Sequence, residues 1–255
     1  MLSKSLRDPD LLREKCYVAG EWIAAASGKT IAVTNPATGE KIATVPSLSA
    51  EETRRAIEAA RDAQPAWAAM TGKERAAILR KWYDLMMANQ DDLALIMTSE
   101  QGKPLNEAKG EIAYAAAFIE WFGEEGKRVY GDAIPGFSRD RRIVVLKQPI
   151  GVTAAITPWN FPAAMITRKA GPALAVGCAQ VIKPASQTPL SALALCVLAE
   201  RAGVPKGILS CVTGSATVIG GELTSNPIVR QLSFTGSTEV GKVLMKQCAD
   251  TGKRT

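Results

Sequence analysis

Histidine is absent from this chain of 255 residues. Its absence excludes Ser-His-Asp and Cys-His catalysis, zinc sites that use histidine, and proton transfer by an imidazole. The cysteines are few and far apart, form no C-x-x-C pair and lie mostly beside Ala, Leu or Val: Cys16, Cys178, Cys196, Cys211 and Cys248. This pattern is typical of buried, reduced thiols in a cytosolic protein, and we expect no metal site.

Aromatic residues make up only 5% of the chain, against 47% hydrophobic residues. A core of Ala, Val, Ile and Leu is therefore expected, which favours an α/β fold. The apolar stretch at 170–182 is shorter than the roughly 20 residues that cross a bilayer, and Pro172 and Gly177 interrupt it. Charged residues crowd the first 25 positions, so no signal peptide is expected. The sequence predicts a cytoplasmic protein with no membrane partner.

Acidic residues are scarce in the second part of the chain. Residues 151–255 carry 10 basic and 4 acidic side chains, whereas residues 1–150 carry 21 of each. The basic residues occur in runs no longer than two, which argues against a nucleic-acid partner. Two explanations stay open: a site for a smaller anion, or a complementary acidic surface on something outside this chain.

The first 150 residues predict short strands followed by helices. We expect a hairpin at 17–22, a turn at 35–39 and a compact strand at 143–146, enclosed by Arg142 and Lys147. Ser49 with Glu52, and Thr71 with Glu74, have the form of capping boxes that start two helices. A third long helix is expected after Pro104.

From residue 151 onward, strand and helix patterns alternate. Strands are expected at 152–157, 180–183, 208–213 and 229–235. Helices are expected near 162–176, 189–202, 216–223 and 237–248. A repeating βα unit requires a parallel sheet with helices on both faces, so we place a domain boundary at residue 150.

Three of the expected strands end in polar or rigid sequences, at 157–162, 183–186 and 234–237. Because ligands bind beyond the carboxyl ends of parallel strands, all three segments should lie at one edge of the sheet. Gly236 and Ser237 join a strand to a helix, which suits either an anion site or a simple turn and cap. The G-x-G-x-x-G fingerprint is absent.

Two side chains at this edge have a chemical and a structural interpretation. Lys183 precedes a proline and could bind a ribose hydroxyl or a phosphate, or be a solvated lysine at a strand end. Asn160 lies between two prolines and could donate an amide N–H to developing negative charge, or form an Asx turn.

Together these segments resemble the aldehyde dehydrogenase superfamily, which carries T-P-W-N-F-P, K-P-A and F-T-G-S in this order and at these spacings. Residues 100–104 are a further matching segment, and the likeness extends from Trp22 to the last residues. It is greatest to NADP-dependent succinate-semialdehyde dehydrogenases, on the segments 120–122, 127–128, 131–132, 147–152 and 163–169.

The resemblance implies a Rossmann-like parallel sheet with flanking helices, and oxidation of an aldehyde through a thiohemiacetal and a thioester, with hydride passed to a nicotinamide. Asn160 matches the oxyanion-hole residue. Lys183, with Pro184 and Ala185, would hold the adenosine ribose or its phosphate, and Gly236 and Ser237 the pyrophosphate. The wall of the nicotinamide channel would comprise Ile156, Thr157, Pro158 and Trp159.

Two positions bear on cofactor and substrate choice. Ser186 stands where NAD-preferring members usually carry glutamate, so repulsion of a 2′-phosphate is removed and NADP is favoured, with weaker use of NAD. Arg168 matches an arginine that grips the distal carboxylate of succinate semialdehyde; the alternative is a helix arginine paired with a surface acid.

The family's catalytic cysteine and general-base glutamate would lie beyond Thr255. The chain is thus expected to be the cofactor-binding half, with the catalytic domain absent. Residues 1–150 would form the hairpin, helices and first part of an oligomerisation arm, and 151–255 the dinucleotide-binding core. The isolated chain should be inactive and prone to association, and the full-length protein a homo-oligomer acting in 4-aminobutyrate degradation. The alternatives are a non-catalytic nucleotide-binding or interaction module, or a dehydrogenase for a related semialdehyde.

Overall fold

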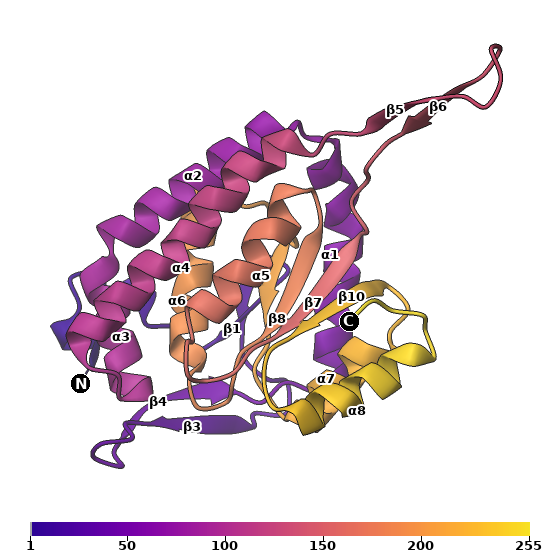
Figure 1. Ribbon diagram of the computed structural model, residues 1–255. Coiled ribbons are helices and arrows are strands. Elements are labelled where there is room, and N and C mark those ends of the chain that lie inside the picture. Colours follow the sequence, from indigo (N-terminus) through magenta and orange to yellow (C-terminus); the bar gives the residue numbers. More distant parts are fainter. Residues whose placement is uncertain (1) are drawn as a thin grey trace.

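The central feature of the fold is a mostly parallel sheet, seen in a computed structural model that describes residues 2–255 (Figure 1). Its strand order is β10-β7-β8-β9-β1-β2. The parallel strands are β7 (Val152–Ile156), β8 (Ala179–Lys183), β9 (Leu209–Cys211) and β10 (Val229–Phe234). The parallel sheet predicted from the alternating pattern is confirmed, and each strand boundary agrees with the prediction to within two residues.

Helices cover both faces of this sheet. The connecting helices are α5 (Ala164–Ala175), α6 (Pro189–Ala202), α7 (Ala216–Ser225) and α8 (Thr238–Ala249). Figure 1 shows α5 and α6 on one side and α7 and α8 on the other, together with α1 (Ala50–Ala69). The chain therefore crosses to the opposite face between β9 and β10, because β10 pairs with β7 on the side away from β8.

The N-terminal hairpin belongs to the same sheet. Strands β1 (Cys16–Val18) and β2 (Glu21–Ile23) pair antiparallel, with Tyr17 opposite Trp22, and Tyr17 also pairs with Cys211 of β9. The sheet therefore contains residues from both sides of position 150. The domain boundary at that position stays a prediction. A separate hairpin of β3 (Thr30–Thr34) and β4 (Lys41–Pro46) encloses the predicted turn at 35–39.

Helix α1 covers the sheet directly, and the three helices that follow it form an outer layer over α5 and α6. After α1 come α2 (Gly72–Ala88), α3 (Gln90–Gln101) and α4 (Leu105–Glu125). Both predicted capping boxes are present. The sequence analysis missed α3. Asn89 alone separates this helix from α2, and neither glycine nor proline marks the boundary.

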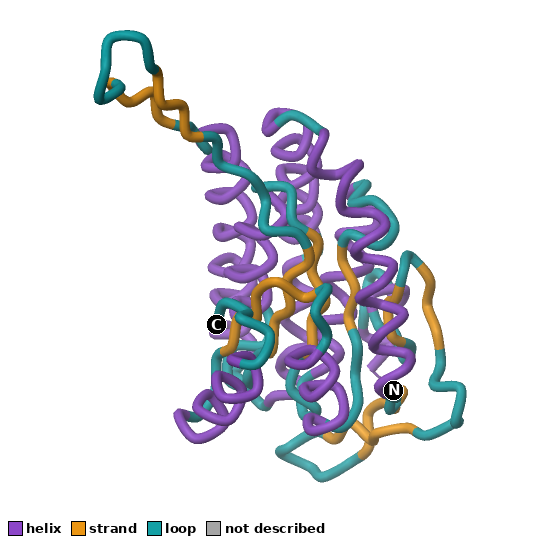
Figure 2. The backbone as a smooth tube through the Cα atoms, turned by 90° about the vertical axis from the view of Figure 1, so that its right-hand side faces the viewer, coloured by secondary structure: helices purple, strands orange, loops and turns teal. Residues whose placement is uncertain are grey.

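A second hairpin projects from the molecule between α4 and β7 (Figure 2). It consists of β5 (Asp132–Pro135), which was not predicted, and β6 (Arg142–Val145), and every residue of both strands is exposed. Short 3-10 turns occupy Leu2–Ser5, Pro9–Leu11 and Gly126–Arg128. In the described part of the chain, none of the helices combines the length and apolarity that crossing a bilayer demands.

Loss of the Thr71 cap should destabilise the fold. The Thr71 hydroxyl accepts a hydrogen bond from the Glu74 N–H at 3.3 Å, and the Thr71 N–H donates to the Glu74 carboxylate at 2.7 Å. Thr71→Ala should lower the free energy of unfolding by about 1 kcal/mol, measured by urea denaturation with an unchanged m-value. Ser27→Ala, in an exposed loop, is the control; equal midpoints for the two variants would contradict the prediction.

Candidate functional site

The carboxyl ends of β7 and β10 form the point where the direction of strand addition reverses. The Thr157 N–H donates to the Lys183 carbonyl at 3.2 Å, and the Thr235 N–H donates to the Ile156 carbonyl at 3.1 Å. The three predicted segments are therefore at one edge, as expected. In open α/β sheets a crevice for ligands occurs at such a reversal, because the neighbouring loops depart toward opposite faces.

The loop after β7 presents its side chains to solvent. Trp159 is 54% exposed, and Asn160 is also exposed. Thr157 is buried, and its hydroxyl has no hydrogen-bond partner within residues 2–255. A buried hydroxyl without a partner at the head of an exposed loop provides a polar group for a ligand.

Lys183 differs from the expected strand-end lysine. Its side chain is buried, with 4% of the residue exposed, and its ammonium group donates to the Pro184 carbonyl at 3.1 Å. Burial lowers the pKa of Lys183. The solvated alternative is therefore wrong, and the ammonium group has donors left for a ligand that enters the edge.

The turn after Lys183 carries Ala185 and Ser186, both half-buried. It closes with a hydrogen bond from the Thr188 N–H to the Ala185 carbonyl at 3.2 Å. Ser186 lies at this turn beyond β8 and before α6. The region can thus accept a group that approaches along the carboxyl edge.

Gly236 and Ser237 both have structural roles. The Phe234 ring occupies the space that a Cβ atom at position 236 would need, so a side chain there would displace the ring. The Ser237 hydroxyl caps α8 by accepting from the Val240 N–H at 3.3 Å. The turn-and-cap interpretation is confirmed for Ser237, while the exposed first turn of α8 still offers free N–H groups to an anion.

An apolar cleft that sequence analysis missed lies beside this turn. It has a volume of about 410 Å³ and separates α7 from α8, with Gly220 and Gly221 on one wall and Val240 and Val243 on the other. A Cβ added to either glycine would meet open space. The two adjacent glycines in α7 were the available signal, since they make a flat wall against which a planar ring can lie.

Arg168 lies on α5, just over one turn from its start. Its guanidinium group donates to the Tyr114 hydroxyl at 2.8 Å and lies 4.8 Å from the centre of the Phe118 ring. No acidic side chain of residues 2–255 forms an ion pair with it, so the surface-acid alternative is wrong. Aromatic neighbours orient the guanidinium group and leave its charge free for an anionic ligand.

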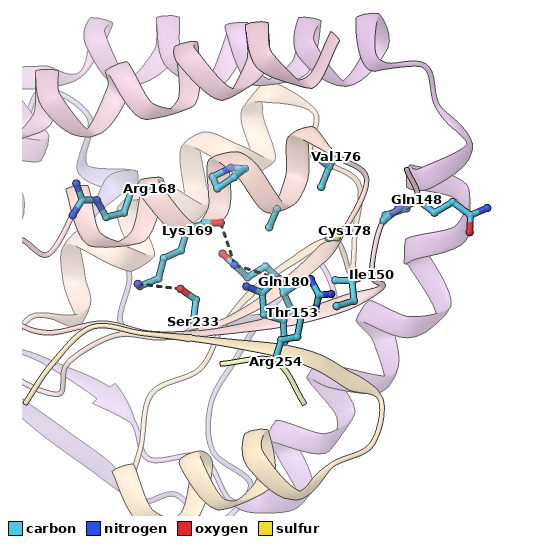
Figure 3. A pocket seen from close by; sticks show the side chains of 14 residues that line it. Gln148, Ile150, Thr153, Arg168, Lys169, Val176, Cys178, Gln180, Ser233 and Arg254 are labelled. Carbon is cyan, nitrogen blue, oxygen red and sulfur yellow. Dashed lines mark hydrogen bonds between the residues drawn. The ribbon is translucent and has the colours of Figure 1, made fainter. Parts of the chain in front are cut away.

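A cavity of about 360 Å³ lies between α5 and the sheet (Figure 3). Lys169 donates to the Ser233 hydroxyl at 3.1 Å and to the Thr235 hydroxyl at 2.7 Å. Burial lowers the pKa of Lys169. The Arg168 side chain points away from this cavity in Figure 3. Among the predicted site residues only Arg168 borders it, so the cavity is separate from the carboxyl edge.

All the cysteines are buried and reduced. Burial raises the pKa of Cys16 to about 12 and raises the pKa of Cys178 and Cys248 above their usual value. These three thiols are therefore protonated near neutral pH and cannot act as ready nucleophiles.

Two buried carboxylates, to which the sequence analysis gave no role, cap the helices at this edge. Glu100, at the end of α3, accepts hydrogen bonds from the Leu190 and Ser191 N–H groups of α6, both at 2.7 Å. Glu111, on α4, accepts from the Ala163 and Ala164 N–H groups at the start of α5, at 3.0 and 3.3 Å. Neither α5 nor α6 has a side-chain cap of its own.

The sheet order and the reversal at β7 and β10 define a Rossmann-like α/β fold of the kind found in nucleotide-binding domains. The particular family follows from comparison with known proteins. Residues 22–255 match the model of the aldehyde dehydrogenase family, and the chain belongs to that family.

Several semialdehyde dehydrogenases are similar to this chain. Over 249 residues, 98% of the chain, it is 70% identical to glutarate-semialdehyde dehydrogenase of Pseudomonas aeruginosa and 67% identical to succinate-semialdehyde dehydrogenase (NADP(+)) GabD of Escherichia coli. In each case it covers 52% of the relative. The chain thus spans about half the length of these relatives.

A solved structure supports the same fold. A crystal structure of an aldehyde dehydrogenase from Brucella melitensis biovar abortus superimposes with a TM-score of 0.98 at 66% identity. The match covers 98% of this chain and 52% of that one. The expected fold class is therefore confirmed.

Protonation of Glu100 should make stability depend on pH. Burial raises the pKa of Glu100 from 4.5 to about 7, while the hydrogen bonds from Ser191 and Leu190 partly oppose this shift. The folded chain then binds more protons than the unfolded chain between these values, so stability should fall as pH rises through this window. The contribution approaches about 1.4 kcal/mol per pH unit.

Urea denaturation from pH 4.5 to 8 tests this expectation by comparing wild type with Glu100→Gln. The difference in unfolding free energy should change across the window, because glutamine does not titrate. Glu74→Gln is the control: hydrogen bonds lower the pKa of Glu74 from 4.5, so its contribution to stability is lost only at lower pH and should stay nearly constant across this range. Parallel stability curves for wild type and Glu100→Gln would contradict the assignment.

Proposed function

We propose that this chain is the cofactor-binding half of a semialdehyde dehydrogenase that prefers NADP to NAD. The main support for this proposal is that three polar segments meet at the carboxyl ends of β7, β8 and β10, where the strand order reverses. The similarity to an NADP-dependent relative supports this choice of cofactor. When bound, the cofactor would accept the hydride of the aldehyde.

The described residues suit a dinucleotide laid along this edge. The cleft between α7 and α8 fits a planar base, because glycines form one wall and valines the other. Lys183 and Ser186 would hold the adenosine ribose and its 2′-phosphate, and Gly236 with the first turn of α8 the pyrophosphate. The hydroxyl of Thr157, which has no partner among residues 2–255, and the exposed Trp159 would lie along the nicotinamide end.

The substrate would be a short aldehyde with a carboxylate at the far end. Asn160 would donate its amide N–H to the oxygen that becomes negative when the aldehyde is attacked. Arg168 would bind the distal carboxylate, because its guanidinium group is oriented by Tyr114 and has no acidic partner in the described chain. The relatives named for succinate and glutarate semialdehyde support this class.

The chain by itself is proposed to lack turnover, because the cysteine thiols are buried and no histidine is present.

A second candidate, a non-catalytic module that pairs with other copies, is favoured by the projecting β5–β6 hairpin, in which every residue of both strands is exposed. Cytoplasmic location is supported by the reduced thiols. A domain boundary at residue 150 is part of this proposal.

A titration of the 255-residue chain with NADP and NAD, followed by tryptophan fluorescence, tests cofactor binding. Saturable binding with NADP tighter than NAD is expected. Ser186→Glu should raise the dissociation constant for NADP at least about tenfold, because the added carboxylate repels the 2′-phosphate, and should leave NAD binding within a small factor.

The neutral variant Ser186→Ala separates the effects of charge and of the lost hydroxyl, and should weaken NADP binding less than Ser186→Glu. Absence of saturable binding in a chain shown to be folded by circular dichroism would contradict the proposed function. Equal weakening of NAD and NADP by Ser186→Glu would contradict the role of position 186 in selecting the phosphate.

An assay of the same chain for NADPH formation from succinate semialdehyde distinguishes the half-enzyme from a complete catalyst. We expect no aldehyde-dependent NADPH above the rate without protein, since the cysteines are all buried. Turnover that persists after repurification would show that another nucleophile serves the reaction.

A further inference from the structure

The turn between α3 and α4 contacts the loop that carries Asn160. At this turn the Lys103 ammonium group donates to the Asn160 carbonyl at 3.1 Å and lies 4.0 Å from the centre of the Phe161 ring. It also forms an ion pair with Glu111. Only 11% of the Lys103 side chain and 1% of the Glu111 side chain are exposed, so the pair is shielded from water.

Glu111 extends this contact to the start of α5. One carboxylate oxygen pairs with Lys103, and the other accepts the hydrogen bonds from Ala163 and Ala164. Since Ala163 cannot cap the helix with its own side chain, Glu111 takes that role from another element. The charge also complements the positive end of the helix dipole.

These contacts immobilise both ends of a five-residue segment. Lys103 holds its first residue, Asn160, through the carbonyl group, and Glu111 holds its last, Ala164, through the N–H group. Between them, the Phe161 ring lies against the Lys103 ammonium group. Each member of the ion pair compensates the charge of the other, so loss of either leaves a buried charge that distorts the segment.

We propose that Lys103 and Glu111 are positioning residues that hold the Asn160 loop in one conformation. The consequence for catalysis rests on the proposed function, because a hydrogen-bond donor lowers a barrier only when it is already aimed at the charge that develops. Neither residue would touch the aldehyde. They would act by fixing the backbone from the Asn160 carbonyl to the start of α5, directly after the donor residue.

The hydrogen-exchange rates of the Ala163 and Ala164 amides in the 255-residue chain measure directly how firmly Glu111 holds the end of this segment. Glu111→Ala should speed their exchange at least about tenfold, because both amides lose their acceptor. The matched control is Glu120→Ala, which removes a carboxylate from the same helix and breaks the exposed ion pair with Arg80. Equal exchange at both amides in the two variants would overturn the proposal.

Variants at Lys103 separate positioning from a general loss of stability. Lys103→Met should increase acrylamide quenching of Trp159 at least about twofold, whereas Lys103→Arg should restore the wild-type value because it keeps a cationic donor. The measurement uses a Trp121→Phe background, since Trp121 is the other exposed tryptophan, at 62%. Unchanged quenching in a folded Lys103→Met chain would overturn the role of Lys103.

The Leu190 and Ser191 amides serve as an internal reference, because Glu100 and not Glu111 caps them. Their exchange should stay at the wild-type rate in Glu111→Ala; acceleration equal to that at Ala163 would indicate global unfolding and overturn the proposal. Should Glu111→Ala fail to fold, the double variant Glu111→Gln with Lys103→Met removes both charges and keeps an acceptor for the Ala163 N–H group. In this variant the Ala163 amide should exchange at the wild-type rate, whereas acrylamide quenching of Trp159 should increase. Failure of the wild-type chain to bind NADP would contradict the proposed function and leave the positioning role standing, since neither hydrogen exchange nor acrylamide quenching requires the cofactor.

Discussion

The reversal of strand order between β9 and β10 is the constraint on which the candidate site depends. Strands β7, β8 and β9 add in one direction, and β10 then pairs with the free side of β7. The loop after β7 and the turn after β10 consequently begin side by side, joined by the hydrogen bond from Thr235 to Ile156. Lys183 reaches the same edge from β8. No local property of these segments brings them together; the order of the strands does.

The outer helices complete the edge that the sheet creates. Helices α5 and α6 begin without side-chain caps of their own, and their first N–H groups would be unsatisfied. Glu111 and Glu100 supply buried carboxylates from α4 and α3. The same outer layer provides Tyr114, which orients Arg168. The N-terminal helices are thus a structural part of the candidate site, and the sheet alone would leave its loops poorly held.

Local patterns were sufficient for most elements and insufficient where the signal was weak. The βα alternation after residue 151 predicted the parallel strands, because apolar runs separated by turn residues mark them clearly. Helix α3 was missed, since Asn89 alone separates it from α2 and no glycine or proline marks its start. Strand β5 was missed because it contains aspartate and proline, which are uncommon in strands, whereas the equally exposed β6 is rich in β-branched residues.

The sequence by itself determined the family, the parallel sheet and the segments that meet at its edge, since motif identity and spacing are properties of the chain. Only the tertiary structure decided the state of each side chain. Lys183 is buried, Ser237 caps α8, and Arg168 contacts aromatic rings with no acidic partner among the described residues. The cleft between α7 and α8 and the pairing of Lys103 with Glu111 likewise appear only after folding. Burial and hydrogen-bond partners depend on residues far apart in the chain, which no local pattern encodes.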